Sequence, residues 1–220
     1  MSQEFFDFGF KAKMRDDNFI VSESNQRALA VIEEWPHWKT HALFIYGPKD
    51  SGKTMLANIW MEISKARKLT PNDIYTMVSK PTEKKGQCYI VENIENVYDE
   101  AAFFHFFNRV KEEGGYILMT AQNHPTNLKI RLPDLRSRIN SVTCCSVSNP
   151  DDELLRTLFF KHFIERQLKV EMSVVDYLVL RTERSFEAVA RIVEEIDISA
   201  LKEKKNITIP FVKTILSQMD

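Results

Sequence analysis

The stretch that decides the fold is Gly47-Pro48-Lys49-Asp50-Ser51-Gly52-Lys53-Thr54. It fits the P-loop pattern G-x-x-x-x-G-K-[ST], a glycine-rich turn whose backbone N–H groups hold phosphate. Before it, residues 42–46 form an apolar run of strand type, and after it residues 54–61 carry apolar side chains at helical spacing. Because a helix N-terminus attracts anions, this order of strand, loop and helix predicts a nucleotide-binding site.

The P-loop would share the nucleotide with an acid from a neighbouring strand. Lys53 is expected to reach the β- and γ-phosphates, and the Thr54 hydroxyl to hold Mg²⁺. Glu92 follows a short apolar run and is a second candidate Mg²⁺ ligand; the alternative is a solvated strand end. Asn93 beside it is a poor general base, so we expect slow or absent intrinsic hydrolysis. The expected cofactors are ADP or ATP with Mg²⁺. The predicted nucleotide-binding residues of this segment are Gly47, Pro48, Lys49, Asp50, Ser51, Gly52, Lys53, Thr54 and Met55.

The composition is that of an ordinary globular protein. The chain has 220 residues, with 30 Lys and Arg against 31 Asp and Glu. A net charge of −1 gives no global reason to expect nucleic-acid binding. No apolar stretch approaches the length of a membrane span, and the N-terminus lacks the basic start of a signal peptide. We therefore expect a cytoplasmic protein.

Two domains and a leader are predicted. Strand-type runs at residues 42–46, 74–78, 88–91, 116–120 and 142–147 alternate with helical stretches. This pattern is typical of an α/β fold with a five-stranded parallel sheet covered on both faces. After Pro150 the pattern is helical only, with Asp151 as a helix cap and further helices over 174–180, 183–196 and from Pro210. The expected divisions are a leader (1–17), a nucleotide-binding α/β domain (18–149) and a small α-helical lid (150–220).

Four phenylalanines lie in the first ten residues, which is unusual for an N-terminal tail. One interpretation is a short peptide motif whose aromatic side chains enter a pocket on a partner protein. The other is a leader that packs on its own domain.

Several segments of the chain together resemble the AAA+ ATPases, and among them the replication initiator DnaA and the Hda (homologous to DnaA) regulatory family. Besides the P-loop, these are residues 18–21, 90–95 (Ile-Val-Glu-Asn-Ile-Glu), 132–138 (Leu-Pro-Asp-Leu-Arg-Ser-Arg) and 207–213 (Ile-Thr-Ile-Pro-Phe-Val-Lys). The resemblance implies that Phe19, Ile20 and Val21 line the adenine pocket and that Gln122 or Asn123 takes the sensor 1 place.

The resemblance also implies roles for two arginines. Arg138 corresponds to the arginine finger, a catalytic group offered in trans to a neighbouring subunit's nucleotide, and Arg184 to the sensor 2 arginine of the lid. A guanidinium can fork onto phosphate oxygens and spread developing charge. The alternative for either residue is a surface ion pair.

In the Hda family the leader carries a motif that binds the β subunit sliding clamp of DNA polymerase, and Gln3, Phe6 and Phe8 resemble it. The resemblance implies a clamp-associated regulator that stimulates hydrolysis of DnaA-bound ATP, located at the nucleoid through its partners. Sequence-specific DNA binding of its own and membrane association are not expected. A self-active ATPase of helicase-loader or DNA-remodelling type and a non-catalytic nucleotide-gated adaptor are the alternatives, and a homo-oligomer is one option for its assembly.

Overall fold

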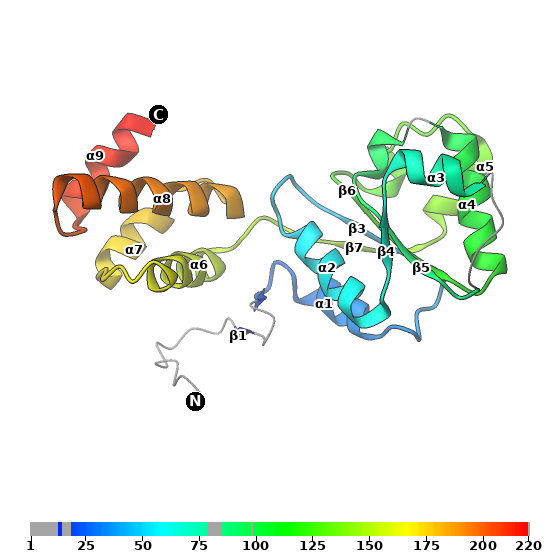
Figure 1. Cartoon of the computed structure of the whole chain (residues 1–220), viewed down its shortest axis with the longest axis horizontal. Helices are drawn as coiled ribbons and strands as arrows, with labels where there is room; N and C mark the ends of the chain where they lie inside the picture. Colours follow the sequence, from blue (N-terminus) through cyan, green and yellow to red (C-terminus); the bar gives the residue numbers. More distant parts are fainter. Residues whose placement is uncertain (1–12, 15–18, 79–84, 98, 220) are drawn as a thin grey trace. The chain divides into compact units, whose positions relative to one another are not determined.

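The computed structural model describes residues 13–14, 19–78, 85–97 and 99–219. They form two compact units (Figure 1). The α/β unit is Asn25–Ser148, and the helical unit joins the described residues before Asn25 to those from Asn149 onward. The sequence favoured placing residues 18–24 in the α/β domain. In the structure, β2 (Ile20–Val21) packs on α6 (Asp152–Glu165), so Ile20 lies in the core of the helical unit.

The centre of the α/β unit is a parallel sheet of five strands in the order β4-β5-β6-β3-β7. The strands are β3 (Ala42–Tyr46), β4 (Arg67–Leu69), β5 (Cys88–Val91), β6 (Tyr116–Ala121) and β7 (Thr143–Ser146). The middle strands β3, β5 and β6 are mostly apolar because both faces of the sheet are covered. This confirms the predicted fold class, and it places β3 between β6 and β7.

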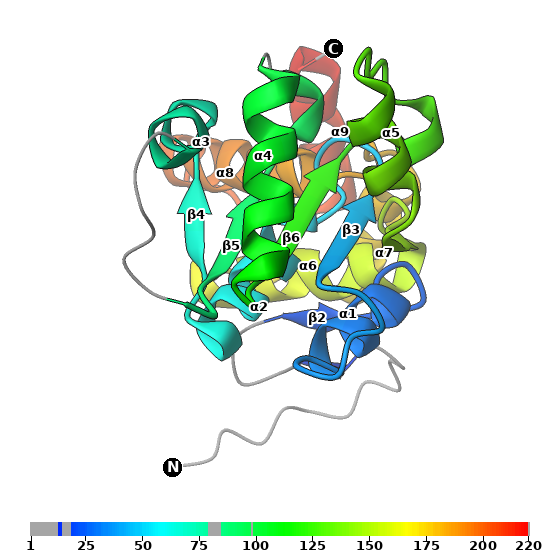
Figure 2. The same cartoon turned by 90° about the vertical axis from the view of Figure 1, so that its right-hand side faces the viewer.

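Helices cover both faces of this sheet. Phe44 and Met119 pack on one side with Phe103 and Phe106 of α4 (Glu100–Glu112) and Leu135 of α5 (Pro133–Asn140). Figure 2 shows α4 lying across this face. On the other side α1 (Gln26–Glu33) contacts β7, and α2 (Lys53–Ser64) contacts β5 and β6. Two short 3₁₀ turns, η1 (Ile94–Asn96) and η2 (Pro125–Asn127), follow β5 and β6 at the carboxyl edge of the sheet.

The prediction of a strand over 74–78 was wrong, because this segment belongs to helix α3 (Pro71–Val78). The missing strand is β4, a short edge strand that precedes it and has two exposed basic residues. A reciprocal cap starts the helix. The Thr70 N–H and hydroxyl both donate to the Asp73 carboxylate, at 2.8 and 2.7 Å, and the Asp73 N–H donates to the Thr70 hydroxyl at 3.3 Å. This capping box outweighs the β-branched and aromatic residues that favoured a strand.

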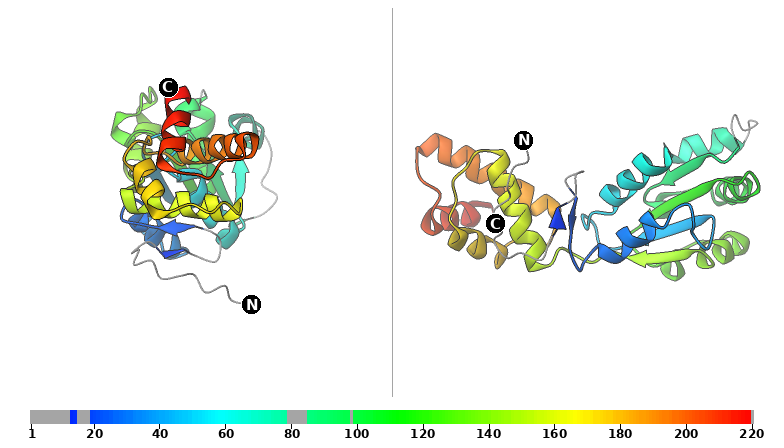
Figure 3. Two further views of the ribbon diagram at one scale, coloured as in Figure 1. Left: turned by 90° about the vertical axis from the view of Figure 1, so that its left-hand side faces the viewer. Right: turned by 90° about the horizontal axis from the view of Figure 1, so that it is seen from below.

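The helical unit contains α6, α7 (Met172–Val179), α8 (Phe186–Glu203) and α9 (Ile209–Met219), seen in Figure 3. The Asp151 carboxylate accepts the Leu154 N–H at 2.8 Å, so this predicted cap is confirmed. Ser185 caps α8 in the same way. Helix α8 ends only at Glu203, beyond the predicted residue 196, because apolar residues continue to face the core up to Ala200. No helix of the described residues is long and apolar enough to cross a membrane.

The reciprocal cap of α3 can be tested by substitution. Asp73→Ala removes the acceptor of the Thr70 N–H and is expected to destabilise α3 by about 1 kcal/mol. Asp73→Asn keeps an acceptor oxygen and is expected to lose less. Hydrogen exchange of the α3 amides measures the difference, and equal protection in Asp73→Ala and the unsubstituted protein would contradict the assignment.

Candidate nucleotide-binding site

The P-loop leaves the carboxyl end of β3 between its two neighbouring strands. Gly47 N–H donates to the Ala121 carbonyl at 3.2 Å, and Val147 N–H donates to the Tyr46 carbonyl at 2.7 Å. A Cβ atom at position 47 would lie 2.1 Å from the Val147 carbonyl oxygen, so this position requires glycine. Gly52 has φ 92° and is the residue immediately before α2. Only glycine adopts this positive φ angle without strain, so the backbone conformation also explains the second glycine of the motif.

Lys53 is the first residue of α2, and its side chain is only 8% exposed. Its ammonium donates to the Gly47 carbonyl at 2.9 Å and to the Pro48 carbonyl. Desolvation lowers the pKa of Lys53, while the carboxylates of Glu95, Asp50 and Glu92 oppose this shift. A buried cation held over the loop is the group that an entering phosphate would meet.

Two further features fit a phosphate group at this loop. The Ser51 hydroxyl is buried and has no hydrogen-bond partner among the described residues. Helix α2 has twelve residues, and its first N–H groups face the loop at the positive end of the helix dipole. Thr54 is exposed on the first turn of α2, where its hydroxyl can reach a bound metal ion. The loop residues therefore fit the nucleotide predicted from the sequence.

The carboxyl edge of the sheet brings the candidate metal ligand close to the next strand. The Asn93 N–H donates to the hydroxyl of Thr120, which is buried at the end of β6, at 3.2 Å. Glu92 is 12% exposed, and one of its oxygens is paired with the Lys68 ammonium from edge strand β4. The other oxygen is buried without a partner among the described residues. Glu92 can thus coordinate Mg²⁺ through this second oxygen. Its ion pair with Lys68 could not be predicted from the sequence.

Glu95 is an acidic residue after β5, and the sequence could not show which way its side chain points. In the structure its carboxylate accepts the Gln122 N–H at 3.1 Å, which joins η1 to the end of β6. Its charge is also the largest favourable one acting on the Lys53 ammonium. Glu95 therefore faces the nucleotide edge of the sheet. Only the backbone N–H of Gln122 takes part in this contact. The assignment of Gln122 or Asn123 to the sensor 1 place stays a prediction.

Arg138 lies far from the P-loop of its own chain. It is in the last turn of α5, which leads into the start of β7 beside the start of β3. Its charge helps to lower the pKa of His41, the residue before β3, to about 4, after burial and Lys111. His41 and Gly47 flank the five residues of β3, which span roughly 15–20 Å at the rise of a strand. Arg138 and Lys53 are therefore at opposite edges of the sheet.

The side chain of Arg138 is exposed, and it has no hydrogen-bond or ion-pair partner among the described residues. By contrast, the guanidinium of Arg136, two residues earlier, donates to the Ile130 carbonyl at 2.9 Å. The alternative of a surface ion pair thus has no support at Arg138.

Arg184 does form such an ion pair. Its guanidinium lies 2.6 Å from the Asp152 carboxylate and also donates to the Pro150 carbonyl, all within the helical unit. Phe19 and Ile20 are buried in the same unit, and Val21 is half-buried. The adenine and sensor 2 roles of these residues stay predictions. Gln3, Phe6 and Phe8 lie outside the described residues.

Comparison with known proteins agrees with this architecture. Residues 151–216 match the family model described as "Hda, lid domain". Domain III of the Thermotoga maritima replication initiation protein DnaA has a TM-score of 0.73 at 16% identity, covering 94% of this chain and 98% of that one. Residues 151–216 therefore resemble the lid domain of the Hda family, and the chain as a whole has the AAA+ fold of DnaA domain III.

Two further proteins extend the comparison. AMPPCP-bound DnaA from Aquifex aeolicus has a TM-score of 0.67 at 20% identity, over 84% of this chain; the chain spans 65% of that DnaA, less than two thirds. An uncharacterized protein of Haemophilus influenzae is 27% identical over 218 residues, covering 92% of this chain and 90% of its own length. The similarity to DnaA at these identities concerns the fold.

The Lys68–Glu92 pair leads to a prediction about metal binding. Lys68→Met removes the cation that competes for the Glu92 carboxylate. We expect Mg²⁺ to raise the affinity for ATP more strongly in this variant, by about five- to tenfold, the equivalent of roughly 1 kcal/mol for a partly exposed pair. Titration of a fluorescent ATP analogue with Mg²⁺ and with EDTA measures the effect.

Lys39→Met serves as the control, because Lys39 is exposed on the connection before β3 and far from Glu92 along the chain. The same Mg²⁺ effect in Lys68→Met, Lys39→Met and the unsubstituted protein would contradict a competition between lysine and metal.

Proposed function

We propose that this chain is a regulator of DNA replication initiation that stimulates hydrolysis of ATP bound to DnaA. The observation that carries the proposal is the position of Arg138, exposed and unpaired among the described residues, at the edge of the sheet opposite Lys53. An arginine in this place cannot reach the nucleotide of its own P-loop. It is available to the nucleotide of a neighbouring subunit.

The chemistry of the proposal lies in the guanidinium group. Phosphoryl transfer spreads negative charge over the equatorial oxygens of the γ-phosphate, and a planar fork of N–H donors stabilises that charge. Arginine fingers supplied in trans raise such rates by roughly 10³–10⁵ in GTPases. Arg138 would act in this way on ATP held by DnaA, leaving the initiator with ADP.

The nucleotide of this chain's own P-loop would have a structural role. Lys53 and the N-terminus of α2 would hold the phosphates, and Thr54 with Glu92 would hold Mg²⁺, which neutralises phosphate charge when bound. Asn93 cannot take a proton, and Lys68 engages the acid beside it. Both features support weak intrinsic turnover. The adenine base would rest on Phe19, Ile20 and Val21, and Arg184 would exchange its Asp152 partner for a phosphate.

The leader completes the proposal. Gln3, Phe6 and Phe8 would dock as a short peptide on the DNA-loaded sliding clamp, so that the regulator acts only where a clamp is present. A self-active ATPase is the second candidate function, since Glu95 is an acid that faces the same edge as Lys53. That candidate predicts steady-state ATP turnover by this chain alone, which Lys53→Ala would abolish.

Arg138→Ala provides the main test. We expect the substitution to reduce stimulated hydrolysis of DnaA-bound ATP by at least about a hundredfold, because the transition-state charge loses its donor. Arg138→Lys should recover little, since an ammonium lacks the planar fork. The measurement is the conversion of labelled ATP to ADP on DnaA in the presence of loaded clamp.

Arg131→Ala is the matched control. Arg131 is also exposed, and only its backbone N–H takes part in the contact with Glu100, so the substitution leaves that contact intact. A second variant, Gln3→Ala, should remove only the part of the stimulation that depends on the clamp. No stimulation by the unsubstituted protein would overturn the proposal.

A further inference from the structure

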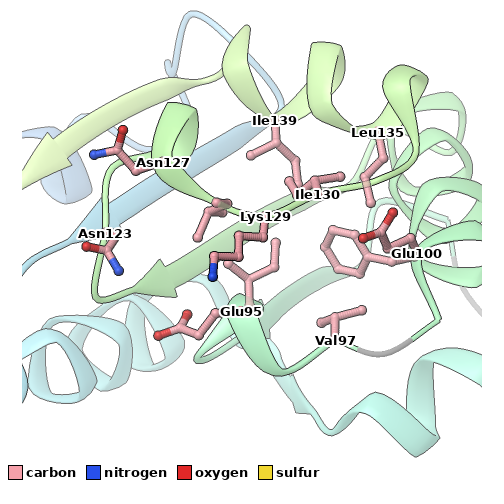
Figure 4. Close-up of a pocket in the computed structure, with 12 residues that line it drawn as sticks. Glu95, Val97, Glu100, Asn123, Asn127, Lys129, Ile130, Leu135 and Ile139 are labelled. Atoms are coloured by element: carbon pink, nitrogen blue, oxygen red, sulfur yellow. The ribbon is translucent and has the colours of Figure 1, made fainter.

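A pocket of about 260 Å³ opens beside η1 and η2, entirely within the α/β unit (Figure 4). No residue of the P-loop lines it. Its walls come from η1, α4, α5 and the connection from β6 to α5. Helices α4 and α5 cover the face of the sheet away from α2. It shares two residues with the nucleotide site described above, namely Glu95, which also faces Lys53, and Asn123, one of the two candidates for the sensor 1 place.

The floor of the pocket is apolar. It is made by side chains of the hydrophobic core that are fully or largely buried, namely Ile94, Phe103, Leu135 and Ile139. Half-buried Val97, Leu128 and Ile130 extend this surface toward the opening. A ligand with an aromatic or branched aliphatic body would therefore replace water on this surface.

The rim of the pocket carries the polar groups. Lys129, Asn123 and Asn127 come from the same connection between β6 and α5. Figure 4 shows Lys129 extending over the middle of the pocket, with Asn123 and Asn127 on one side and Glu100 and Leu135 on the other. The Lys129 ammonium has no ion-pair partner in the part of the chain that the structure describes.

The two carboxylates that line the pocket are already engaged. Glu100 accepts the Arg131 N–H at 2.9 Å and also the Leu132 N–H, both at the start of α5. Glu95 accepts the Gln122 N–H and faces the positive charge of Lys53. Neither carboxylate is paired with Lys129, so its ammonium can donate to an anion. The NH₂ groups of Asn123 and Asn127 can donate as well, although the carbonyl oxygen of Asn127 accepts the Thr126 hydroxyl at 3.5 Å.

We propose that this pocket binds a small amphipathic carboxylate, with its apolar body on the floor and its carboxylate on Lys129, Asn123 and Asn127. The volume lies just below the roughly 300–1,000 Å³ of sites for drug-sized ligands, so the ligand is the size of a fragment. An open pocket of this kind and a charge-assisted contact at its rim give an expected dissociation constant on the order of 1 mM. The binding itself is independent of the proposed function.

The test uses 3-phenylpropionate as the probe and the full-length chain as the receptor. Two-dimensional NMR titration is expected to move the amide signals of residues 94–97 and 122–130. The amine of the same shape, 3-phenylpropylamine, should bind at least about tenfold more weakly. Its ammonium meets Lys129 as a like charge at the rim, while the Glu95 and Glu100 carboxylates are already engaged by backbone N–H groups. Lys129→Gln should weaken binding of the carboxylate by about tenfold, as expected for loss of a charge-assisted hydrogen bond.

Two further variants complete the design. Lys39→Gln removes an exposed lysine elsewhere on the unit and should leave the affinity unchanged. Val97→Trp fills the pocket and should abolish binding, with thermal unfolding and nucleotide affinity showing that the protein still folds. Equal binding of the carboxylate and the amine, an unchanged affinity in Lys129→Gln, or signal changes only outside the pocket would overturn the proposal.

Discussion

The pairing of β3 between β6 and β7 is the constraint on which the rest of the molecule depends. Parallel strands begin at one edge of a sheet and end at the other, so every loop after a strand lies at the carboxyl edge. The P-loop and Glu92 meet Thr120 there, because the P-loop follows β3, Glu92 follows β5, and Thr120 lies at the end of β6. Helix α5 leads back to the opposite edge before β7 begins, and it carries Arg138 with it. The separation of the P-loop from Arg138 is therefore built into the topology.

The carboxyl edge of the sheet is also held together by contacts that do not involve a nucleotide. The Lys53 ammonium donates to the carbonyls of its own loop, and Glu95 ties η1 to the end of β6. Lys68 pairs with Glu92 across the neighbouring strand. The buried Lys53 ammonium and the largely buried Glu92 carboxylate thus each have at least one partner, as the high cost of desolvating an isolated charge requires. A nucleotide would exchange these partners rather than create charge interactions where none existed.

Much of this architecture follows from the sequence, since the P-loop and the long apolar runs are local signals. The parallel sheet, the P-loop helix and the capped start of α6 could be predicted from them. The strand proposed for 74–78 failed because Ile74, Tyr75 and Val78 suit both patterns, and the Thr70–Asp73 box decided for a helix. The Lys68–Glu92 pair and the direction of Glu95 could not be predicted, because they depend on which strands are neighbours. The packing of Ile20 with the helical unit is likewise a contact between distant segments.

The central claim is that Arg138 serves another subunit and not its own nucleotide. The most direct measurement is single-turnover hydrolysis of ATP bound to this chain alone, followed over a wide range of protein concentration for the unsubstituted protein and Arg138→Ala. We expect equal rates for the two proteins in dilute solution, with any difference appearing only when a second subunit, a copy of the chain or DnaA, is added. A lower rate in Arg138→Ala that persists at every dilution would contradict it.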